Sequence, residues 1–401
     1  MKVLQLCNKP PYPPVDGGTI AMNSITQGLL GEKCLVRVLS VCSDKHPVNK
    51  ALLTEDYIEK TRFESVYIDL NIKILDALLS LFLGESYNVK RYESKDFSMK
   101  LVSILKAEEF DIIHVESIFL TPYLPLIRRY SNAKVVLRAH NVEHLIWKRV
   151  AKCTKNIFKR WYIKKLYLAL RLYELEHIGK YDGIACITQK DVDYFKSNGC
   201  KRPIESIPFG IIAPDIMDNV DEEPNSLFHI GSMDWIPNLE AVDWFLNEVW
   251  NKVHAELPMA RLYLAGRKMP QHLMKMDCPN VSVIGEVPDA MYFIESKKIN
   301  IVPLLSGSGI RVKIIEAMSV GKTVISTTVG AEGIDYTDGV DILIADTPED
   351  FVRQIKRCLE DDDFCTTIGR NAFNLVATHY NNELLTKKLL SFYDALLDRD
   401  E

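Results

Sequence analysis

Short apolar runs alternate with longer amphipathic stretches through the first half of the chain. Runs such as KVLQLC from Lys2 and KVVLRAH from Lys134 are continuously apolar over most of their length. Strands buried on both faces give this pattern, and amphipathic stretches between them have the length of helices. Strands that alternate with helices predict a parallel sheet covered by helices on both faces.

The second half repeats this plan, with runs such as SLFHIGS from Ser226, INIVPLL from Ile299 and KTVISTTV from Lys322. Between the halves, IIAPDIMDNVDEEPNS is acidic, contains two prolines and has no apolar period, as expected of a linker. The predicted fold class is therefore α/β, with two doubly wound parallel-sheet domains facing a central cleft. Ligands in such sheets bind beyond the carboxyl ends of strands, so function is expected in the loops there.

The predicted boundaries follow the same pattern. Residues 1–205 form an N-terminal acceptor-side domain and 206–226 a linker, while 227–370 form a C-terminal nucleotide-binding domain. The remaining residues, 371–401, are expected to be helical and to pack across the cleft.

Composition adds three expectations. With 47% hydrophobic and 26% charged residues, the chain is typical of a globular protein. Its longest uncharged apolar run, near Ile74 to Leu83, is shorter than the ~20 residues that span a bilayer. The N-terminus lacks a signal-peptide pattern and the nine cysteines lack zinc-type spacing, so we expect a cytoplasmic protein with reduced thiols and no metal site.

Charge is distributed unevenly. Residues 1–200 hold 30 Lys and Arg against 22 Asp and Glu, whereas residues 201–401 hold 19 against 32. The stretch from Trp147 to Arg171 has nine basic residues, no acid and several aromatics. It predicts either a basic amphipathic helix at an anionic membrane surface or a helix packed on the first sheet with a solvated cationic face. The candidate membrane or acceptor contacts are Lys159, Arg160, Lys164 and Lys165. Nucleic acid is not an expected partner, because the second half is acidic and no nucleic-acid motif is present.

The most informative loop is Ser306-Gly307-Ser308-Gly309, which follows an apolar run and precedes a helix predicted to begin near Gly309. Glycines there allow backbone amides to approach a phosphate at the helix N-terminus. Lys313 and Glu316 are three residues apart and share a helix face. A cation for phosphates and a carboxylate for ribose hydroxyls suit a nucleotide, while the alternative is a surface ion pair beside a simple turn.

Several motifs carry a resemblance to a known family. GSGIRVKIIEAM, GKTVISTTVGAEGI and FHIGSMDWIPNLEAVDWF resemble the C-terminal domain of retaining family 4 glycosyltransferases (glycosyl transferases group 1), which have the GT-B fold of two Rossmann-like domains. In the first half, PPYPPVDGGTIAMNSITQGL resembles the glycine-rich first loop of that family, and RAHNVEH resembles its histidine-bearing loop.

The resemblance implies a hexosyltransferase-type enzyme. It would move a sugar from a nucleotide-diphosphate donor to a glycan or polyisoprenoid-diphosphate-linked acceptor in polysaccharide biosynthesis, with retention of configuration. No metal or resident cofactor is implied, and the nucleotide sugar is a co-substrate. Contact with the inner face of an anionic membrane is compatible with such acceptors.

The resemblance also assigns roles on the donor side. Amides of the loop at Ser308, Gly309 and Ile310 would bind the diphosphate, and Glu316 would bind the ribose hydroxyls. The family usually has a second carboxylate eight residues earlier, where this chain has Ser308. Further donor-side candidates are Arg311 and Lys313, Gly231 and Ser232 after the first strand of the second domain, Arg267 and Lys268 after its second strand, and Val287 at the nucleobase.

The first half contributes three candidates. Gly17 and Gly18 follow a proline-rich loop and would bring amides to the sugar or phosphate, unless they only form a turn before a helix. His140 ends an apolar strand, and by resemblance it contacts the donor sugar near the reacting carbon. His140 and Glu316 are thus the candidate catalytic residues, and no general base is nominated.

Two other functions remain open from sequence. One is a nucleotide-sugar 2-epimerase of the same architecture, and the other is a noncatalytic nucleotide-binding or scaffold protein, which the serine at 308 would favour. A dinucleotide oxidoreductase is disfavoured because no G-x-G-x-x-G motif follows the first strand.

Overall fold

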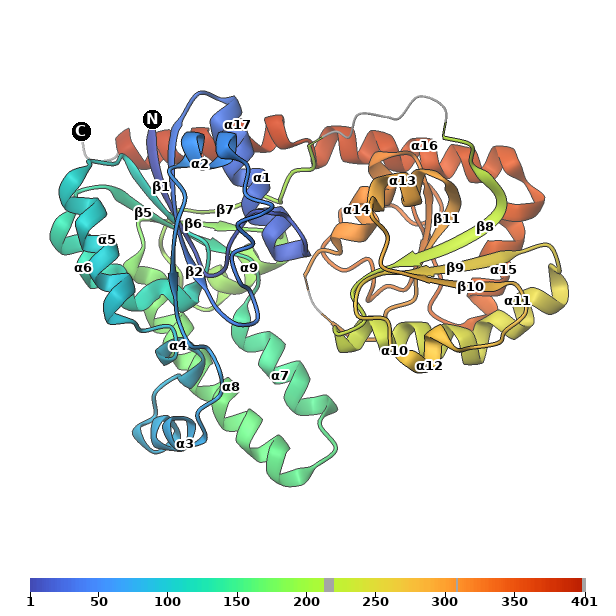
Figure 1. Ribbon diagram of the computed structural model, residues 1–401, viewed down its shortest axis with the longest axis horizontal. Coiled ribbons are helices and arrows are strands. Elements are labelled where there is room, and N and C mark those ends of the chain that lie inside the picture. The colour runs from blue at the N-terminus through green and yellow to red at the C-terminus, as the bar shows by residue number, and fades with distance from the viewer. Residues whose placement is uncertain (213–219, 308, 399–401) are drawn as a thin grey trace. The chain divides into compact units, whose positions relative to one another are not determined.

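The computed structural model describes residues 1–212, 220–307 and 309–398. The chain forms two compact units (Figure 1). Unit 1 comprises Met1–Gly210 together with the chain from Asn382 on, and unit 2 comprises Ile211–Asn381. Part of the predicted linker, residues 213–219, lies outside the described residues.

Unit 1 is built on a seven-stranded parallel sheet with strand order β3-β2-β1-β4-β5-β6-β7. The strands are β1 (Lys2–Cys7), β2 (Leu35–Cys42), β3 (Glu64–Tyr67), β4 (Ile112–Val115), β5 (Lys134–Ala139), β6 (Gly183–Cys186) and β7 (Ile204–Ser206). The helices are α1 (Gly17–Gly31), α2 (Glu55–Thr61), α3 (Ile74–Leu83), α4 (Tyr87–Lys90), α5 (Lys95–Ala107), α6 (Leu124–Tyr130), α7 (Glu143–Cys153), α8 (Ile157–His177), α9 (Gln189–Ser197) and α17 (Asn382–Leu397).

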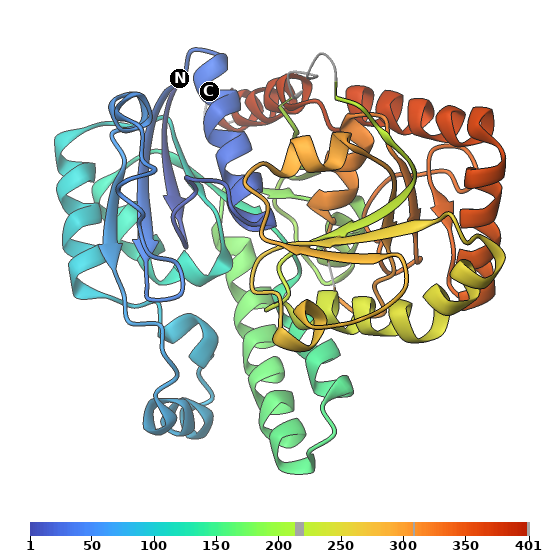
Figure 2. The same cartoon turned by 45° about the vertical axis from the view of Figure 1, so that its right-hand side comes forward.

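The central strand β1 shows why the sheet is covered on both faces. Leu4 and Leu6 belong to the apolar cluster on one face, whereas Val3 and Cys7 belong to the cluster on the other. Side chains alternate across a strand, so a strand buried on both sides is apolar at successive positions. The second cluster lies under α1 and α17, the helices at opposite ends of the sequence (Figure 2).

Unit 2 has a six-stranded parallel sheet with strand order β10-β9-β8-β11-β12-β13. Its strands are β8 (Glu223–Ile230), β9 (Arg261–Ala265), β10 (Val281–Gly285), β11 (Lys297–Val302), β12 (Thr323–Ser326) and β13 (Leu343–Ile344). Its helices are α10 (Ile236–Trp244), which continues through a π-helical turn into α11 (Asn251–Glu256), then α12 (Gln271–Met274), α13 (Ala290–Glu295), α14 (Val312–Ser319), α15 (Pro348–Glu360) and α16 (Asp362–His379). The prediction of two doubly wound parallel sheets is confirmed.

Two details differ from the sequence expectations. Strand β8 begins at Glu223, inside the stretch assigned to the linker. The segment 371–401 is divided, because α16 lies in unit 2 while α17 lies in unit 1. The apolar side chains of α17 complete the unit 1 core, which explains its place there; they are Leu389, Phe392, Tyr393 and Leu396.

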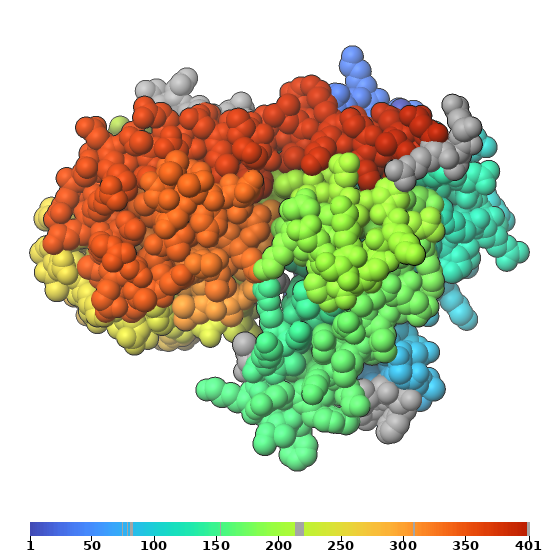
Figure 3. All heavy atoms as spheres, turned by 180° about the vertical axis from the view of Figure 1, so that it is seen from behind, coloured from blue at the N-terminus to red at the C-terminus, as the bar shows by residue number. Residues whose placement is uncertain are grey.

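The basic stretch forms two helices, and the expectation of a single basic helix is wrong. Helices α7 and α8 pack against each other as a hairpin, which projects from unit 1 in Figures 1 and 3. Helix α8 starts anew because the Asn156 side chain accepts a hydrogen bond from the Lys159 amide at 2.9 Å, which caps its first turn. Within the described ranges, no helix combines the length and the apolar composition needed to cross a membrane.

Candidate active site

Glycines lie at the carboxyl ends of three neighbouring strands of unit 2: Gly231 follows β8, Gly266 follows β9, and Gly285 is the last residue of β10. The Gly231 amide donates to the Ala265 carbonyl at 3.1 Å, and the Gly266 amide donates to the Gly285 carbonyl at 2.7 Å. Gly266 has φ +141°, and a Cβ there would lie 1.7 Å from the Gly231 carbonyl oxygen. Only glycine fits at this position, and so the carboxyl end of the sheet presents bare backbone.

The loop between β11 and α14 also depends on glycine. Gly307 has φ +120° and Gly309 has φ +81°. Helix α14 begins at Val312, three residues later than predicted, because Arg311 is its extended N-cap residue. Ser308 lies outside the described residues, while Gly309 and Ile310 lie in the loop.

Arg311 is buried within this loop. It is 5% exposed, its guanidinium donates to the Gly309 carbonyl, and it lies 5.4 Å from the centre of the Trp235 ring. A guanidinium over an aromatic face is a cation–π contact. Arg311 therefore supports the shape of the loop and adds positive charge beside it.

Lys313, in the first turn of α14, makes two polar contacts. Its Nζ donates to Asn238 Oδ1 at 2.8 Å and lies 3.2 Å from His229 Nε2. Burial, and secondarily the charge of Arg311, lowers the pKa of Lys313 to about 7. A Cβ placed on Gly231 would come within 2.6 Å of Nζ, so the glycine leaves the ammonium accessible at the strand end.

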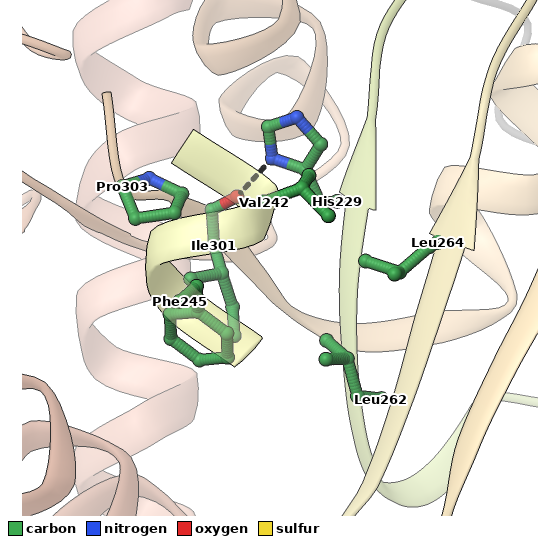
Figure 4. Close-up of a pocket in the computed structure, with 7 residues that line it drawn as sticks. All are labelled: His229, Val242, Phe245, Leu262, Leu264, Ile301 and Pro303. Carbon is green, nitrogen blue, oxygen red and sulfur yellow. Dashed lines mark hydrogen bonds between the residues drawn. The ribbon is translucent and has the colours of Figure 1, made fainter. Parts of the chain in front are cut away.

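His229 is a neutral acceptor for Lys313. Burial and the nearby lysine charge hold the pKa of His229 well below its usual value. Its Nδ1 lies 2.8 Å from the Ile301 carbonyl oxygen, which accepts only, so Nδ1 carries the proton and Nε2 is free to accept. Figure 4 shows this bond beside a small cavity. The apolar cavity, lined by Val242, Phe245, Leu262, Leu264, Ile301 and Pro303 with His229, has room for about one water molecule.

Asn238 holds the Lys313 ammonium against the loop after β8. Its Nδ2 donates to the Ser232 carbonyl at 2.9 Å while its Oδ1 accepts from Lys313. The Ser232 hydroxyl donates instead to Asp234, at 2.7 Å. Asn238 and His229 were not singled out from sequence, although both lie in the family-like stretch FHIGSMDWIPNLEAVDWF. Their contact with Lys313 spans 75 and 84 residues of sequence, so only the fold reveals it.

Glu316 lies one turn after Lys313 on α14. Burial raises the pKa of its carboxyl to about 7, and Lys313 opposes this only in part. No donor within the described ranges bonds to its carboxylate oxygens. A partly buried carboxylate without donors retains its capacity to accept hydrogen bonds from hydroxyl groups of a ligand.

The other donor-side candidates follow strands of the same sheet. Arg267 is partly buried just after β9, and its carbonyl accepts from the Met233 amide at 2.9 Å. Lys268 is exposed in the left-handed region with φ +56°. Val287 is partly buried in the loop after β10.

In unit 1, His140 directly follows β5 and lies beside a fully buried carboxylate. His140 Nε2 lies 2.8 Å from Glu116 Oε2, and the His140 side chain is 17% exposed. Burial alone would raise the pKa of Glu116, but His114 and His140 lower it below its usual range. Burial lowers the pKa of His140, with partial opposition from Glu116. Glu116 is thus an acceptor, so His140 Nε2 carries the proton and Nδ1 has a free lone pair.

Glu116 is the centre of a buried polar network. Its Oε1 accepts from Gln5 Nε2 at 2.6 Å and lies 3.3 Å from His114 Nε2. The Gln5 side-chain oxygen Oε1 in turn accepts from the Thr26 hydroxyl at 2.6 Å. Sequence reasoning missed Glu116; the available signal was a carboxylate directly after the apolar strand β4.

Gly17 and Gly18 are the first two residues of α1. The capping residue Asp16 accepts from the Thr19 amide at 2.9 Å and from Lys9 Nζ at 2.6 Å. Elsewhere in the described chain, no acceptor bonds to the Gly17 or Gly18 amide. The Gly17 and Gly18 amides therefore lie at the start of α1, with Lys9 Nζ only 2.8 Å from where a Gly18 Cβ would lie.

The four predicted membrane or acceptor cations, Lys159, Arg160, Lys164 and Lys165, are exposed on α8. Arg160 donates to the carbonyls of Thr154 and Lys155 at the α7–α8 turn. No acid in the described residues pairs with Lys159, Lys164 or Lys165.

Comparisons with known proteins agree with this architecture. Residues 224–361 match the family model "Glycosyl transferases group 1", and residues 85–213 match "Glycosyltransferase Family 4". An uncharacterized 44.6 kDa protein in the cps region of Klebsiella pneumoniae is 26% identical over 259 residues, which span 62% of this chain and 65% of that protein.

Solved structures share the fold over nearly the whole chain. Sucrose-phosphate synthase from Thermosynechococcus elongatus superposes with a TM-score of 0.67 at 15% identity, covering 100% of both chains. Anabaena Alr3699/HepE in complex with UDP-glucose gives 0.65 at 13%, over 98% of this chain and 100% of that one. The pneumococcal O-GlcNAc transferase GtfA in complex with UDP and GlcNAc gives 0.65 at 10%, over 99% of each. With two parallel-sheet units and both family models matched, the chain belongs to the group 1, family 4 glycosyltransferases of GT-B fold.

Proposed function

We propose that the protein transfers a sugar from a nucleoside-diphosphate donor to a glycan or lipid-linked acceptor, with retention of configuration. One observation carries the proposal: helix α14 presents a partly buried ammonium at its first turn and a carboxylate without donors one turn later, beside a glycine-lined sheet end. The positive group suits a diphosphate and the carboxylate suits the vicinal hydroxyls of ribose.

The donor-side roles follow from the contacts. Lys313, held by Asn238 and His229, binds the diphosphate together with amides of the loop before α14. A dianionic ligand raises the pKa of Lys313, so the lysine is fully charged when the donor is bound. Glu316 accepts from the ribose hydroxyls.

His140 contacts the sugar through Nδ1, which accepts a hydrogen bond from a sugar hydroxyl. The bond between the anomeric carbon and the diphosphate oxygen breaks, and an acceptor hydroxyl oxygen bonds to that carbon on the same face. The hydroxyl proton passes to the departing diphosphate oxygen, which balances the step without a protein base. Lys313 and the loop amides stabilise the charge that develops on the diphosphate.

The relatives guide the choice of substrates. The Anabaena and pneumococcal proteins were solved with UDP-glucose and with UDP and GlcNAc, so uridine nucleotides are the first donors to test. The Klebsiella relative is encoded in a cps region, which supports a role in polysaccharide biosynthesis.

The test is a titration calorimetry panel of UDP, GDP, ADP, dTDP and CMP with the whole protein. We expect one nucleoside diphosphate to bind selectively and Glu316→Ala to weaken that binding about tenfold or more, the usual cost of losing hydrogen bonds to a charged group. If no nucleotide binds, the noncatalytic alternative replaces this proposal. If donor alone is converted to free nucleotide and a rearranged sugar, the 2-epimerase alternative does.

We also propose that unit 1 contacts an anionic membrane through Lys159, Arg160, Lys164 and Lys165, at the inner face of the cytoplasmic membrane. Their exposure and the absence of acids from the whole stretch support this contact. Each cation near such a surface contributes about 1 kcal/mol at physiological salt.

A further inference from the structure

Helix α3 presents leucines to the solvent. Its sequence is ILDALLSLFL, and its residues Leu75, Leu79 and Leu83 are 82%, 54% and 59% exposed. These three leucines are spaced by four residues and therefore lie on one helix face. A helix that packs on a soluble domain normally buries such a face.

The opposite face of α3 carries two buried small residues. Ala77 and Ser80 are buried, at 3% and 1% exposure. Ala77 packs in a small cluster with Tyr87 of α4 and Leu166 of α8. The exposed leucines are thus not a consequence of a detached helix, because α3 is docked on α8 through its other side.

The start of α8 carries a second exposed apolar group. Ile157, Phe158 and Trp161 are 75%, 85% and 56% exposed. They share one face at spacings of three and four residues, while Ile163 and Leu166 on the other face are buried. Figures 1 and 2 show α3 and the α7–α8 turn projecting from the same end of unit 1. We call this group the apolar rim: Leu75, Leu79, Leu83, Ile157, Phe158 and Trp161.

Cations accompany the rim. Lys164 and Lys165 continue the same face of α8, and Lys165 Nζ lies 5.9 Å from the centre of the Trp161 ring. Lysines beside exposed tryptophan, phenylalanine and leucine match the headgroup and acyl boundary of a bilayer, where aromatic rings and snorkelling cations are both stable. Exposed apolar groups on this scale mark an interaction surface, and the unpaired cations select an anionic one.

We propose that the apolar rim inserts into the acyl boundary of an anionic bilayer, so that unit 1 is held by apolar insertion in addition to surface charge. The inference rests on the membrane contact proposed above and extends it to α3. Salt screens the attraction of exposed lysines to headgroups but leaves burial of apolar surface nearly unchanged. Insertion therefore predicts vesicle binding that persists in part at high salt.

The experiment is co-sedimentation of the full chain with vesicles of phosphatidylcholine, alone or mixed with phosphatidylglycerol, at low and high salt. The rim variant carries Leu75→Ser, Leu79→Ser, Phe158→Ser and Trp161→Ser, and the cation variant carries Lys159→Gln, Lys164→Gln and Lys165→Gln. A matched control, Leu35→Ser with Met99→Ser, removes apolar side chains that are 67% and 64% exposed in unit 1 outside the rim.

We expect the rim variant to lose at least tenfold in affinity at high salt, where the cation variant and the control bind like the wild type. At low salt, the cation variant should lose affinity for the mixed vesicles. Insertion would be overturned if the rim variant binds vesicles as tightly as the wild type at high salt. It would also be overturned if the wild-type protein does not bind vesicles at high salt. If the rim variant binds vesicles like the wild type but has a lower molecular mass than the wild type in sedimentation velocity, the rim instead joins two copies of the chain.

A separate readout keeps the donor proposal distinct. Nucleotide affinity measured without vesicles should be the same in the rim variant and the wild type, and equal melting temperatures show that the variant folds. Failure of nucleotide binding in every form would remove the proposed activity without bearing on vesicle binding.

Discussion

The fold shifts the pKa values of two ionisable groups, Lys313 and Glu316, towards neutral pH. Burial lowers the pKa of the lysine and raises the pKa of the glutamate, each to about 7. Burying these two groups destabilises the empty protein. A bound diphosphate stabilises the ammonium, and hydroxyl donors of a ligand stabilise the carboxylate, so the site is prepared for a ligand.

Donor affinity should therefore pass through a maximum near neutral pH. Above about pH 7, binding must add a proton to Lys313, and below about pH 7, it must remove one from Glu316, so affinity falls on both sides. A nucleotide sugar is the right probe because its diphosphate diester does not titrate in this range. Calorimetry should show that Lys313→Met removes the alkaline arm and that Glu316→Gln removes the acidic arm; two unchanged arms in either variant would contradict these roles.

Glu316→Gln should also stabilise the empty protein at alkaline pH. Since the folded pKa lies above the unfolded value, the wild-type residue destabilises the folded state progressively as pH rises from about 4.5 to about 7, and the full destabilisation is present above that range. At pH 8, we expect a gain on the order of 1 kcal/mol, or roughly 2–4 °C in melting temperature. The gain should vanish near pH 4, where the carboxyl is protonated in both states; a constant gain would point to packing instead.

Glu116 is expected to position His140. Glu116→Gln replaces the carboxylate by an amide of the same shape. This weakens the hydrogen bond to His140 Nε2 and the preference of His140 for the tautomer protonated at Nε2. We expect kcat to fall about tenfold to hundredfold with little change in donor KM, because a small misplacement of a reacting group has this cost. In the His140→Ala background the same change should have little further effect on kcat, whereas a purely structural role would give additive losses.

At the scale of elements, glycines decide how closely helices and strands approach. Gly28 of α1 faces α17, where a Cβ would lie 2.0 Å from the Thr386 hydroxyl and 3.1 Å from the Asn382 amide nitrogen. Asn382 Nδ2 donates to the Ser24 carbonyl of α1 at 3.0 Å, so the contact is polar as well as close. The N- and C-terminal helices of unit 1 are thereby joined.

Gly28→Val should separate these helices. The added carbons cannot fit without moving α17, and we expect a loss of about 1–3 kcal/mol in the free energy of unfolding of unit 1, as for overpacked interiors. Chemical denaturation measures it, and Gly31→Ala, on the same helix with open space around its Cβ position, is the control. Equal effects of the two substitutions would contradict the close approach.

At the scale of the whole molecule, each unit has its own core and its own sheet, but unit 1 is discontinuous in sequence. Its second apolar cluster combines residues of β1 and α1 with Leu389, Phe392 and Tyr393 of α17. Tyr393 also bonds to His114 Nδ1 at 2.6 Å, which ties the last helix to the network around Glu116.

A chain that ends after Tyr380 should consequently lose unit 1 and keep unit 2. Without α17, apolar surface of β1 and α1 faces water, so we expect hydrogen exchange through the unit 1 sheet to lose its protection. Unit 2 retains all its strands and α14, and it should still bind the nucleoside diphosphate. Protected unit 1 strands in the truncated chain would show that α17 is dispensable.

The sequence by itself determined the two parallel sheets. Strands that are buried on both faces are apolar without interruption, and in the helices between them apolar residues recur with the helical period. It also placed Glu316, Lys313 and His140 near strand ends or a helix start, since local signals mark these positions. The start of α14 was predicted three residues early, because glycines allow a turn as readily as a helix and the extended Arg311 sets the first turn.

Only the tertiary structure decided which side chains meet. Lys313 with Asn238 and His229, Glu116 with His140, and α17 with α1 are contacts between segments far apart in sequence, and no local pattern specifies such pairs. The leucines of α3 show the same limit, since an apolar run predicts burial and yet Leu75, Leu79 and Leu83 are exposed. A pattern of hydrophobic positions fixes what each element is able to bury, whereas packing against its neighbours decides which face is buried and which groups are left for a ligand.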